Sequence, residues 1–167
     1  MGGIDKGLAP WNGAPFVSHV HASIAPQVER VLISCNRNLD QYRRYADTVF
    51  SDERSDYQGP LAGLEAAQAH LMTPLLLVVP CDMPQLPSNL AARLVAGLEA
   101  DRAADLSYAR SGGRDHYLCA VIRRNSLPSL VDFLESGGRA VHRWYATLRS
   151  ITVEFEDTNA FGNHNSV

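Results

Sequence analysis

The stretch Pro74–Pro84, PLLLVVPCDMP, holds the longest apolar run of the chain and decides the predicted fold. Its residues Leu75 to Val79 show no alternation of polar and apolar side chains, which is typical of a strand buried on both faces. The pattern predicts a central parallel strand, covered by helices on each side, with Asp82 at its end. The run is much shorter than the roughly 20 apolar residues of a membrane span.

The segments on either side alternate between strand and helix patterns. Short apolar or β-branched runs predict further strands at 30–35, 48–51, 105–109, 117–122 and 150–155. Apolar residues at helical spacing, with glycine and proline as punctuation, predict helices at 16–24, 39–45, 61–71, about 89–98 and 127–135. Ser88 and Ser126 precede the last two and are the expected N-caps. This order predicts an α/β fold, with a mostly parallel sheet and helices on both faces.

Bulk composition sets outer limits on the function. The chain has 167 residues, a length that predicts one domain over 1–167, and its net charge is −3. That charge argues against a general binder of nucleic acid or of a membrane surface, so any anion must be held by local groups. Cys35, Cys81 and Cys119 lack the spacing of metal ligands, and reduced thiols together with the absence of a signal-like segment predict a cytoplasmic protein.

Polar side chains stand at the ends of three predicted strands. Ser34 and Asn36 end the first, Asp52 follows the second, and Asp82 follows the apolar run. Ligands of open α/β sheets bind beyond the carboxyl ends of strands, so we expect these residues to converge on one crevice. Asp82, between Pro80 and Pro84, is a hard oxygen ligand that suits Mg²⁺. The alternatives are ordinary ones, since Asp before proline also forms turns and Asp52 could cap the turn before GPLAG (59–63).

Glycine and basic residues at the two ends of the chain point to an anionic ligand. MGGIDKG (1–7) places Lys6 among glycines that allow a phosphate to approach, although Gly7 after Lys6 excludes the G-x-x-x-x-G-K-[ST] loop. Arg139 in GGRAV (137–141) and Asn163 and Asn165 in FGNHN (161–165) suit a polyfunctional anion. Taken alone, Lys6 is a surface turn, Arg139 caps a helix, and the asparagines satisfy a closing turn.

Read in order, MGGIDKG, SCNR, GPLAG, PCDMP, GGRAV and AFGNHN resemble the molybdenum cofactor guanylyltransferases, the family of molybdopterin-guanine dinucleotide biosynthesis protein A, over essentially the whole chain. The resemblance implies a Rossmann-like nucleotidyltransferase fold and transfer of GMP from GTP to the phosphate of molybdenum-bound molybdopterin, with release of pyrophosphate. The implied partners are GTP and molybdopterin, together with other proteins of the cofactor pathway and client molybdoenzymes.

The same resemblance assigns roles to individual residues. It places Lys6 on the triphosphate and Asp82 on Mg²⁺, and makes these two the catalytic pair. It places Ser34, Asn36 and Asp52 on the guanine or ribose side, while the pterin side receives a further set: Gly3, Arg139, Asn163 and Asn165.

The chain departs from the family pattern at its start. Family members begin with a strand and L-A-G-G-x-x-x-R before M-G-G, so we expect that this sequence is a fragment or a miscalled start that lacks the first strand and half of the phosphate loop. Two other functions stay open. One is a related nucleotidyltransferase, which transfers CMP to the same pterin or acts on a sugar phosphate. The other is a non-catalytic protein that binds the pterin or a partner.

Overall fold

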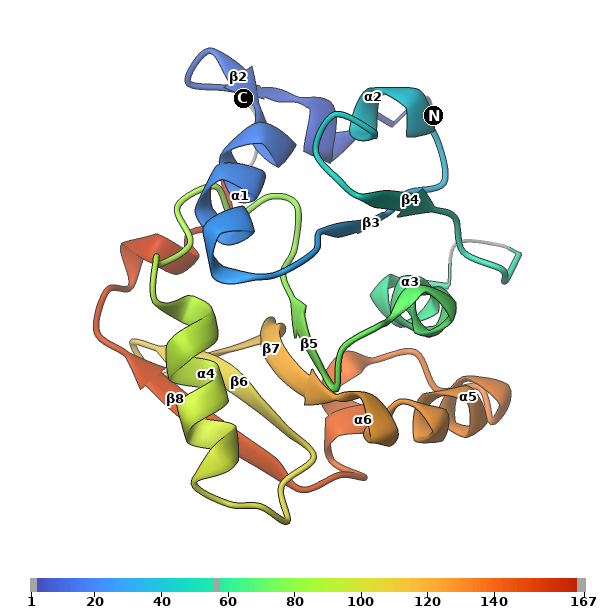
Figure 1. The fold of residues 1–167 in the computed structure, drawn as a ribbon, viewed down its shortest axis with the longest axis vertical. Coiled ribbons are helices and arrows are strands. Elements are labelled where there is room, and N and C mark those ends of the chain that lie inside the picture. Colours follow the sequence, from blue (N-terminus) through green and yellow to red (C-terminus); the bar gives the residue numbers. More distant parts are fainter. Residues whose placement is uncertain (1–2, 56–57, 165–167) are drawn as a thin grey trace.

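A computed structural model of the chain describes residues 3–55 and 58–164 (Figure 1). Its strands form a four-stranded sheet in the order β5-β7-β6-β8, a separate pair β3-β4, and a small hairpin β1-β2. Their bounds are β1 Pro10–Trp11, β2 Ala14–Pro15, β3 Leu32–Ser34, β4 Thr48–Phe50, β5 Leu75–Val78, β6 Leu106–Ser111, β7 Arg114–Arg123 and β8 Ser150–Phe155. Every strand expected from the sequence is therefore confirmed in position.

The helices also lie where the apolar spacing predicts them. They are α1 Phe16–Ile24, α2 Leu39–Tyr42, α3 Pro60–Ala67, α4 Leu90–Glu99 and α5 Pro128–Glu135, with a short unpredicted helix, α6 Val141–Tyr145. The two predicted serine N-caps are wrong. Helix α4 begins after Asn89, and the hydroxyl of Ser126 donates to Asp105 at 2.8 Å instead of to the backbone of α5.

The sheet is mixed, which corrects the expectation of a mostly parallel one. Strands β3-β4 and β6-β8 are parallel, but β7 runs antiparallel to both β5 and β6. The physical reason is the two-residue turn between β6 and β7, where Gly112 and Gly113 adopt φ angles of +54° and +76°. Such a turn can join only antiparallel strands, because a parallel connection needs a crossover of a dozen residues or more.

Strand β5 is the apolar segment that decides the fold, yet it lies at the end of the four-stranded sheet. Among the described strands it pairs only with β7, and β3 pairs only with β4. Each of its four residues is half-buried. The expectation of a central, fully covered strand is therefore wrong for the described residues, because only one edge of β5 is paired.

Helices cover both faces of the four-stranded sheet, as predicted. On β7, Cys119 and Val121 point to one face, where they meet Leu90, Leu94 and Leu98 of α4. The alternate residues Ala120 and Ile122 point to the other face and meet a second cluster, which includes Leu61 of α3, Leu130 of α5 and Trp144 of α6. The period of two along the strand thus divides the core into two layers.

Candidate functional site

The side chains that follow β3 and β4 meet, as the sequence predicts. The carboxylate of Asp52 accepts a hydrogen bond from the Ser34 hydroxyl at 3.2 Å and one from the Asn36 amide at 2.9 Å. The Asn36 side chain in turn accepts from the backbone N–H of Asp52 at 3.0 Å. Parallel pairing of Ser34 with Phe50 brings the two strand ends together and produces this cluster.

Helix α3 packs directly on that cluster. It starts after Gly59, whose φ of +79° suits glycine, and it presents Gly63 to the strand ends. A Cβ atom at Gly63 would lie 2.7 Å from the Ser34 hydroxyl and 3.4 Å from Oδ1 of Asp52. Glycine is therefore required there for the helix to approach, and the backbone of α3 lies next to the side chains of Ser34 and Asp52.

Asp5 organises a second polar group that the sequence analysis missed. Its carboxylate accepts hydrogen bonds from the hydroxyl of Tyr42 and, at 3.0 Å, from the amide of Asn38, while Arg37 lies 4.0 Å away. Burial raises the pKa of the Tyr42 hydroxyl above its usual range, and the bond to Asp5 adds to that shift. The only signal in the sequence is the acid next to Lys6, because the partners of Asp5 come from the distant α2 region.

The charges of Lys6 and Asp82 both affect the pKa of the Cys81 thiol. Burial of the thiol raises its pKa to about 11, although the residue as a whole is exposed. The carboxylates of Asp82 and Asp5 raise that pKa further, while the ammonium group of Lys6 lowers it. The ammonium group of Lys6 is therefore within electrostatic reach of Cys81, the residue before Asp82.

Asp82 is contacted by the C-terminal segment. With the Asn163 amide oriented so that both groups are satisfied, its nitrogen lies 3.0 Å and 2.9 Å from the two carboxylate oxygens of Asp82. The next residue, His164, lies 3.3 Å from the amide oxygen of Gln85, and its ring lies 5.2 Å from that of Trp11. The sequence analysis assigned Asp82 and Asn163 to different ligands, and it did not predict that they touch.

Asp82 is the carboxylate that the sequence predicts as a ligand of Mg²⁺. No group of three or more His, Cys, Asp or Glu side chains within residues 3–55 and 58–164 could hold a metal ion by itself. Mg²⁺ typically takes one or two carboxylates and completes its shell with phosphate oxygens and water. The single carboxylate of Asp82 fits that pattern if phosphate oxygens of a bound nucleotide supply further ligands.

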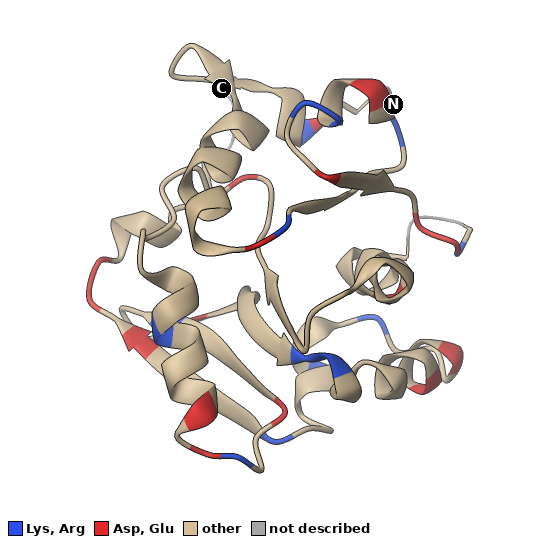
Figure 2. Cartoon of the chain, viewed as in Figure 1, with Lys and Arg blue, Asp and Glu red and all other residues tan. Residues whose placement is uncertain are grey.

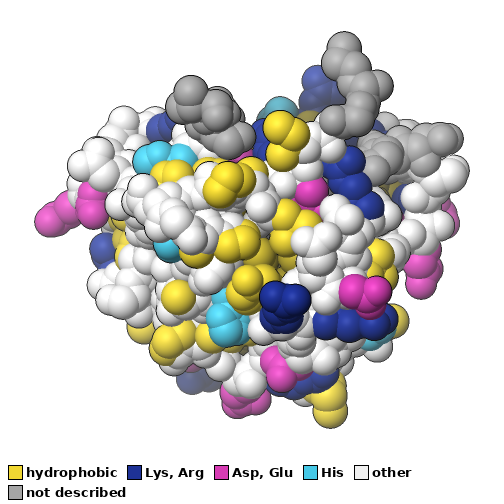
Figure 3. Space-filling view, turned by 90° about the horizontal axis from the view of Figure 1, so that it is seen from above, with side chains coloured by type: hydrophobic (Ala, Val, Ile, Leu, Met, Phe, Trp, Pro, Cys, Tyr) yellow, Lys and Arg dark blue, Asp and Glu magenta, His cyan; other side chains and the backbone are white. Residues whose placement is uncertain are grey.

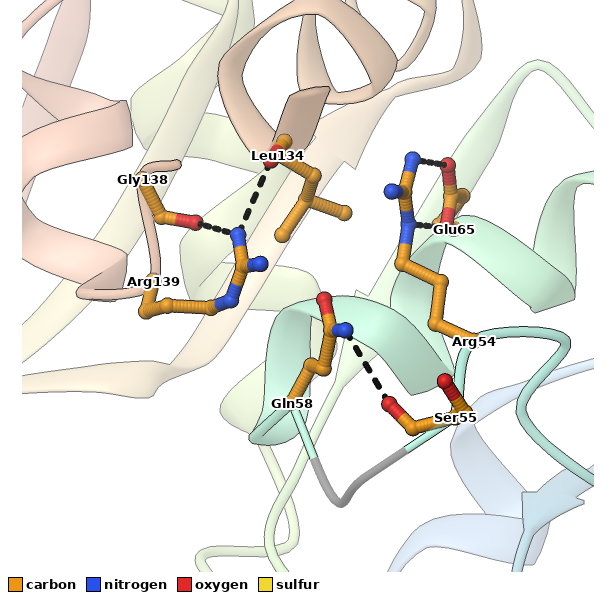
Figure 4. A network of polar contacts seen from close by, with 7 residues as sticks. All are labelled: Arg54, Ser55, Gln58, Glu65, Leu134, Gly138 and Arg139. Carbon is orange, nitrogen blue, oxygen red and sulfur yellow. Dashed lines mark hydrogen bonds and ion pairs between the residues drawn. The ribbon is translucent and has the colours of Figure 1, made fainter. Parts of the chain in front are cut away.

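Arg139 caps a helix in this structure. Its Nη1 donates to the carbonyl of Leu134 at 2.9 Å and to that of Gly138 at 2.5 Å, at the end of α5 (Figure 4). In the same view Arg54 forms a two-bond pair with Glu65 of α3, at 2.6 Å each, and Gln58 donates to Ser55. The side-chain oxygen of Gln58 is buried, and within the described part of the chain it has no hydrogen-bond partner.

Of the remaining expected pterin-side residues, only one can be placed. A Cβ atom at Gly3 would lie 3.8 Å from a guanidinium nitrogen of Arg37, so Gly3 is next to the Asp5 group. Asn165 lies outside the described residues.

Charges of both signs are interspersed over the ribbon (Figure 2). Seen from the end where the two termini lie, hydrophobic side chains gather in the middle of the face, with basic, acidic and histidine side chains among and around them (Figure 3). Each helix of the described residues is too short or too polar to cross a membrane.

Comparisons with known proteins give a consistent result. The model of the MobA-like NTP transferase domain matches residues 1–151. The molybdenum cofactor guanylyltransferase of Shewanella amazonensis is 44% identical over 167 residues, which cover 99% of this chain and 85% of the relative. Among solved structures, molybdopterin-guanine dinucleotide biosynthesis protein A from Archaeoglobus fulgidus superimposes with a TM-score of 0.72 at 18% identity, over 91% of this chain and 76% of that one. A CMP:2-keto-3-deoxy-manno-octonic acid synthetase gives 0.73 at 14% identity, over 91% of this chain and 83% of the other.

Proposed function

Because this chain belongs to the MobA-like NTP transferase family, we propose that it is a molybdenum cofactor guanylyltransferase, which transfers GMP from GTP to molybdenum-bound molybdopterin. The match to the NTP transferase domain and the 44% identity to a guanylyltransferase make the chain an enzyme of the nucleotidyltransferase class. The observation that carries the proposal is the Ser34–Asn36–Asp52 cluster at the ends of β3 and β4, next to Gly63 of α3.

The reaction is a substitution at the α-phosphorus of GTP. An oxygen of the pterin phosphate attacks this phosphorus in line, a new P–O bond forms, and the bond to the β-phosphate oxygen breaks, so that pyrophosphate leaves. The nucleophile is already an anion and needs no dedicated base. Catalysis therefore consists of positioning the two substrates and neutralising charge on the phosphates.

Each residue group has one task in this scheme. Lys6 contacts the triphosphate and stabilises the charge that develops on the leaving pyrophosphate. Asp82 would hold Mg²⁺, which would supply charge neutralisation at the phosphate oxygens. The cluster around Asp52 presents acceptors and donors to the guanine or ribose, with Ser34 and Asn36 as its other members. Backbone of α3 at Gly63 limits how deep the nucleoside enters.

Molybdopterin, the second substrate, is bound by the residues that the resemblance assigns to it. Asn163 and Gly3 lie near Asp82 and the Asp5 group respectively, and Asn165 follows Asn163 in the chain. Arg139 joins them only when its guanidinium leaves the carbonyl groups at the end of α5, because its Nη1 is engaged there. We assign the reaction to the cytoplasm, in keeping with the three free thiols of Cys35, Cys81 and Cys119.

The test is nucleotide choice and metal dependence. We expect GTP with Mg²⁺, at a concentration a hundredfold above its Kd, to raise the melting temperature of the chain by about 5–10 °C. CTP with Mg²⁺ at the same concentration should raise it less. Asp82→Asn should abolish Mg²⁺-dependent transfer of GMP to the pterin. Asp132→Asn, which removes an exposed carboxylate of α5, is the matched control and should keep full activity.

Other outcomes identify the alternatives. A larger shift with CTP would indicate a related cytidylyl transferase. Full transfer activity in Asp82→Asn would refute Asp82 as the metal ligand. No transfer by the parent chain together with no response to either nucleotide would indicate a binding protein without transferase activity.

A further inference from the structure

A large β-bulge interrupts the pairing of β6 with β7 at the carboxyl end of β5. Tyr108 pairs with Ala120, but the next residue of β6 pairs with His116, so residues 117–119 of β7 face no residue of β6. Ala120 is also the partner of the last residue of β5, from which the chain continues to Asp82. Bulges re-aim side chains and are common beside active sites. This one lies at the edge of the sheet where ligands of α/β proteins bind.

Tyr117, within this bulge, belongs to an aromatic group. Its ring lies 5.1 Å from that of Tyr108, 6.0 Å from that of Tyr145 and 5.9 Å from that of His142 on α6. Tyr145 is buried, and its hydroxyl donates to the carbonyl of Tyr117 at 2.8 Å, which holds the bulge in place. Tyr108 and Tyr117 are half-buried and His142 is exposed, so part of this aromatic group is at the surface.

A fixed carboxylate lies beside the Tyr117 ring. Asp115 accepts a hydrogen bond from the Tyr117 hydroxyl at 3.1 Å and two from Arg110, at 2.6 Å and 3.2 Å. The bonds from Arg110 lower the pKa of Asp115, so the carboxylate stays charged at neutral pH. Because a carboxylate offers about four acceptor positions, one is left for an N–H group of a ligand.

We propose that Tyr117 and Asp115 form a pterin seat, which binds the ring of molybdopterin. The proposal rests on the proposed function and deepens it. The flat ring stacks on Tyr117, as bases stack on aromatic side chains of other proteins, and its amino-bearing edge donates to Asp115. The seat is separate from the nucleoside cluster, because β7 pairs with β5 whereas that cluster belongs to the β3-β4 pair. Arg139, which the resemblance assigns to the pterin, comes three residues before His142.

Pterin binding is the first test, with 6-hydroxymethylpterin alone as the probe and quenching of its fluorescence as the readout. Tyr117→Leu keeps an apolar side chain but removes the aromatic ring, and it should weaken binding about tenfold. Tyr117→Phe keeps the ring and should bind the probe nearly as tightly as the parent chain. Tyr45→Leu is the matched control, because Tyr45 is also a half-buried tyrosine beside a histidine, His21, and it should leave binding unchanged.

The second test separates the pterin from guanine, which carries the same amino-bearing ring edge. Asp115→Asn replaces a charged acceptor by a neutral one and should weaken binding of the pterin probe about fivefold. Both Asp115→Asn and Tyr117→Leu should leave the Kd for GTP with Mg²⁺ unchanged. Circular dichroism shows whether each variant keeps the fold, and Asp115→Asn decides the matter if Tyr117→Leu unfolds.

Equal pterin affinity in the parent chain and in a folded Tyr117→Leu or Asp115→Asn would overturn the pterin seat. Absence of quenching by the parent chain, or a loss of GTP affinity in place of pterin affinity, would overturn it too. The pterin titration contains no nucleotide, so a parent chain that binds pterin through Tyr117 but transfers no GMP would refute the proposed function alone. A chain that transfers GMP with the same KM for molybdopterin in Tyr117→Leu would refute the seat alone.

Discussion

His116 is a buried titratable residue that the proposed chemistry does not use. Its Nε2 lies 2.8 Å from the Ser111 hydroxyl, and its ring stacks on Phe161. Burial lowers the pKa of His116 below the ordinary value of 6.5, the nearby Arg114 lowers it further, and Asp115 opposes the shift. The unfolded chain therefore binds a proton more readily than the folded one at mildly acidic pH.

The sign of the resulting pH dependence follows. Above pH 6.5 the imidazole is neutral in both states, and its contribution to stability is fully present. As the pH falls through 6.5 toward the lower folded pKa, stability is lost, with a slope of at most about 1.4 kcal/mol per pH unit. We expect the free energy of unfolding, measured in urea between pH 7.5 and 5, to fall less steeply with decreasing pH in His116→Gln than in the parent chain. Exposed His142→Gln should keep the parent slope, and an equal slope in all three would refute the assignment.

Single residues also show what the sequence could and could not predict. Ser34, Asn36, Asp52 and Asp82 were predicted to converge because each follows a strand. The first three meet, but no hydrogen bond among the described residues joins Asp82 to them. Asp5 was missed because its partners, Asn38 and Tyr42, belong to a short helix that the local pattern does not relate to the N-terminus. A contact between segments more than 30 residues apart leaves no periodic signal in the sequence.

At the scale of elements, helix α3 is where local propensity and the site conflict. Alanine in a helix interior is about 1 kcal/mol more favourable than glycine. Gly63 lies inside α3, yet its added Cβ would meet the Ser34 hydroxyl at 2.7 Å. The glycine thus gives up helix propensity so that the helix can approach the Asp52 cluster.

Gly63→Ala should therefore weaken nucleotide binding more than it weakens the fold. The new methyl group pushes the Ser34 hydroxyl from Asp52, and we expect a roughly tenfold rise in the Kd for GTP, about the worth of one hydrogen bond. The free energy of unfolding should change by less than about 1 kcal/mol, since better helix propensity offsets the local crowding. Calorimetric titration and urea unfolding measure the two quantities. An unchanged Kd would show that the cluster does not contact the nucleotide.

Strand direction was the element-level feature that the sequence analysis got wrong. Apolar runs located β6 and β7 correctly, but a run of apolar residues carries no information about direction. The connection decides it, and Gly112 and Gly113 between two strands are the signal that was available. The apolar run of β5 likewise carried no information about its neighbour. It did not predict that β5 would pair with β7.

At the scale of the whole molecule, the four-stranded sheet joins two apolar layers, whereas the β3-β4 pair is separate from it. A small cluster of Phe50, Ala66 and Ala67 connects β4 with α3, and α3 in turn packs against α5 and the larger sheet. Val20 of α1 packs in the cluster of α4, and Gln27 bonds Pro87 and Ala91, so the N-terminal part also joins the sheet through this second route. We therefore expect residues 1–167 to fold as the single domain that their length predicts.

Trp11 and Trp144 report on different parts of the molecule. Trp11 lies in the β1-β2 hairpin, next to Phe16 of α1, and Trp144 lies fully buried in the α3–α5–α6 cluster. In urea, the emission of Trp144→Phe and of Trp11→Phe should each show the same midpoint as the circular dichroism of the same variant, because a single cooperative domain loses all its structure together. Ile122→Ala, made in each of these backgrounds, removes side-chain packing of β7. It should lower the free energy of unfolding by about 2–5 kcal/mol and shift the urea midpoints of both tryptophan signals downward together. If Ile122→Ala moves the Trp144 transition and leaves the Trp11 transition in place, the chain folds as two units, and nucleotide binding across them depends on how they dock.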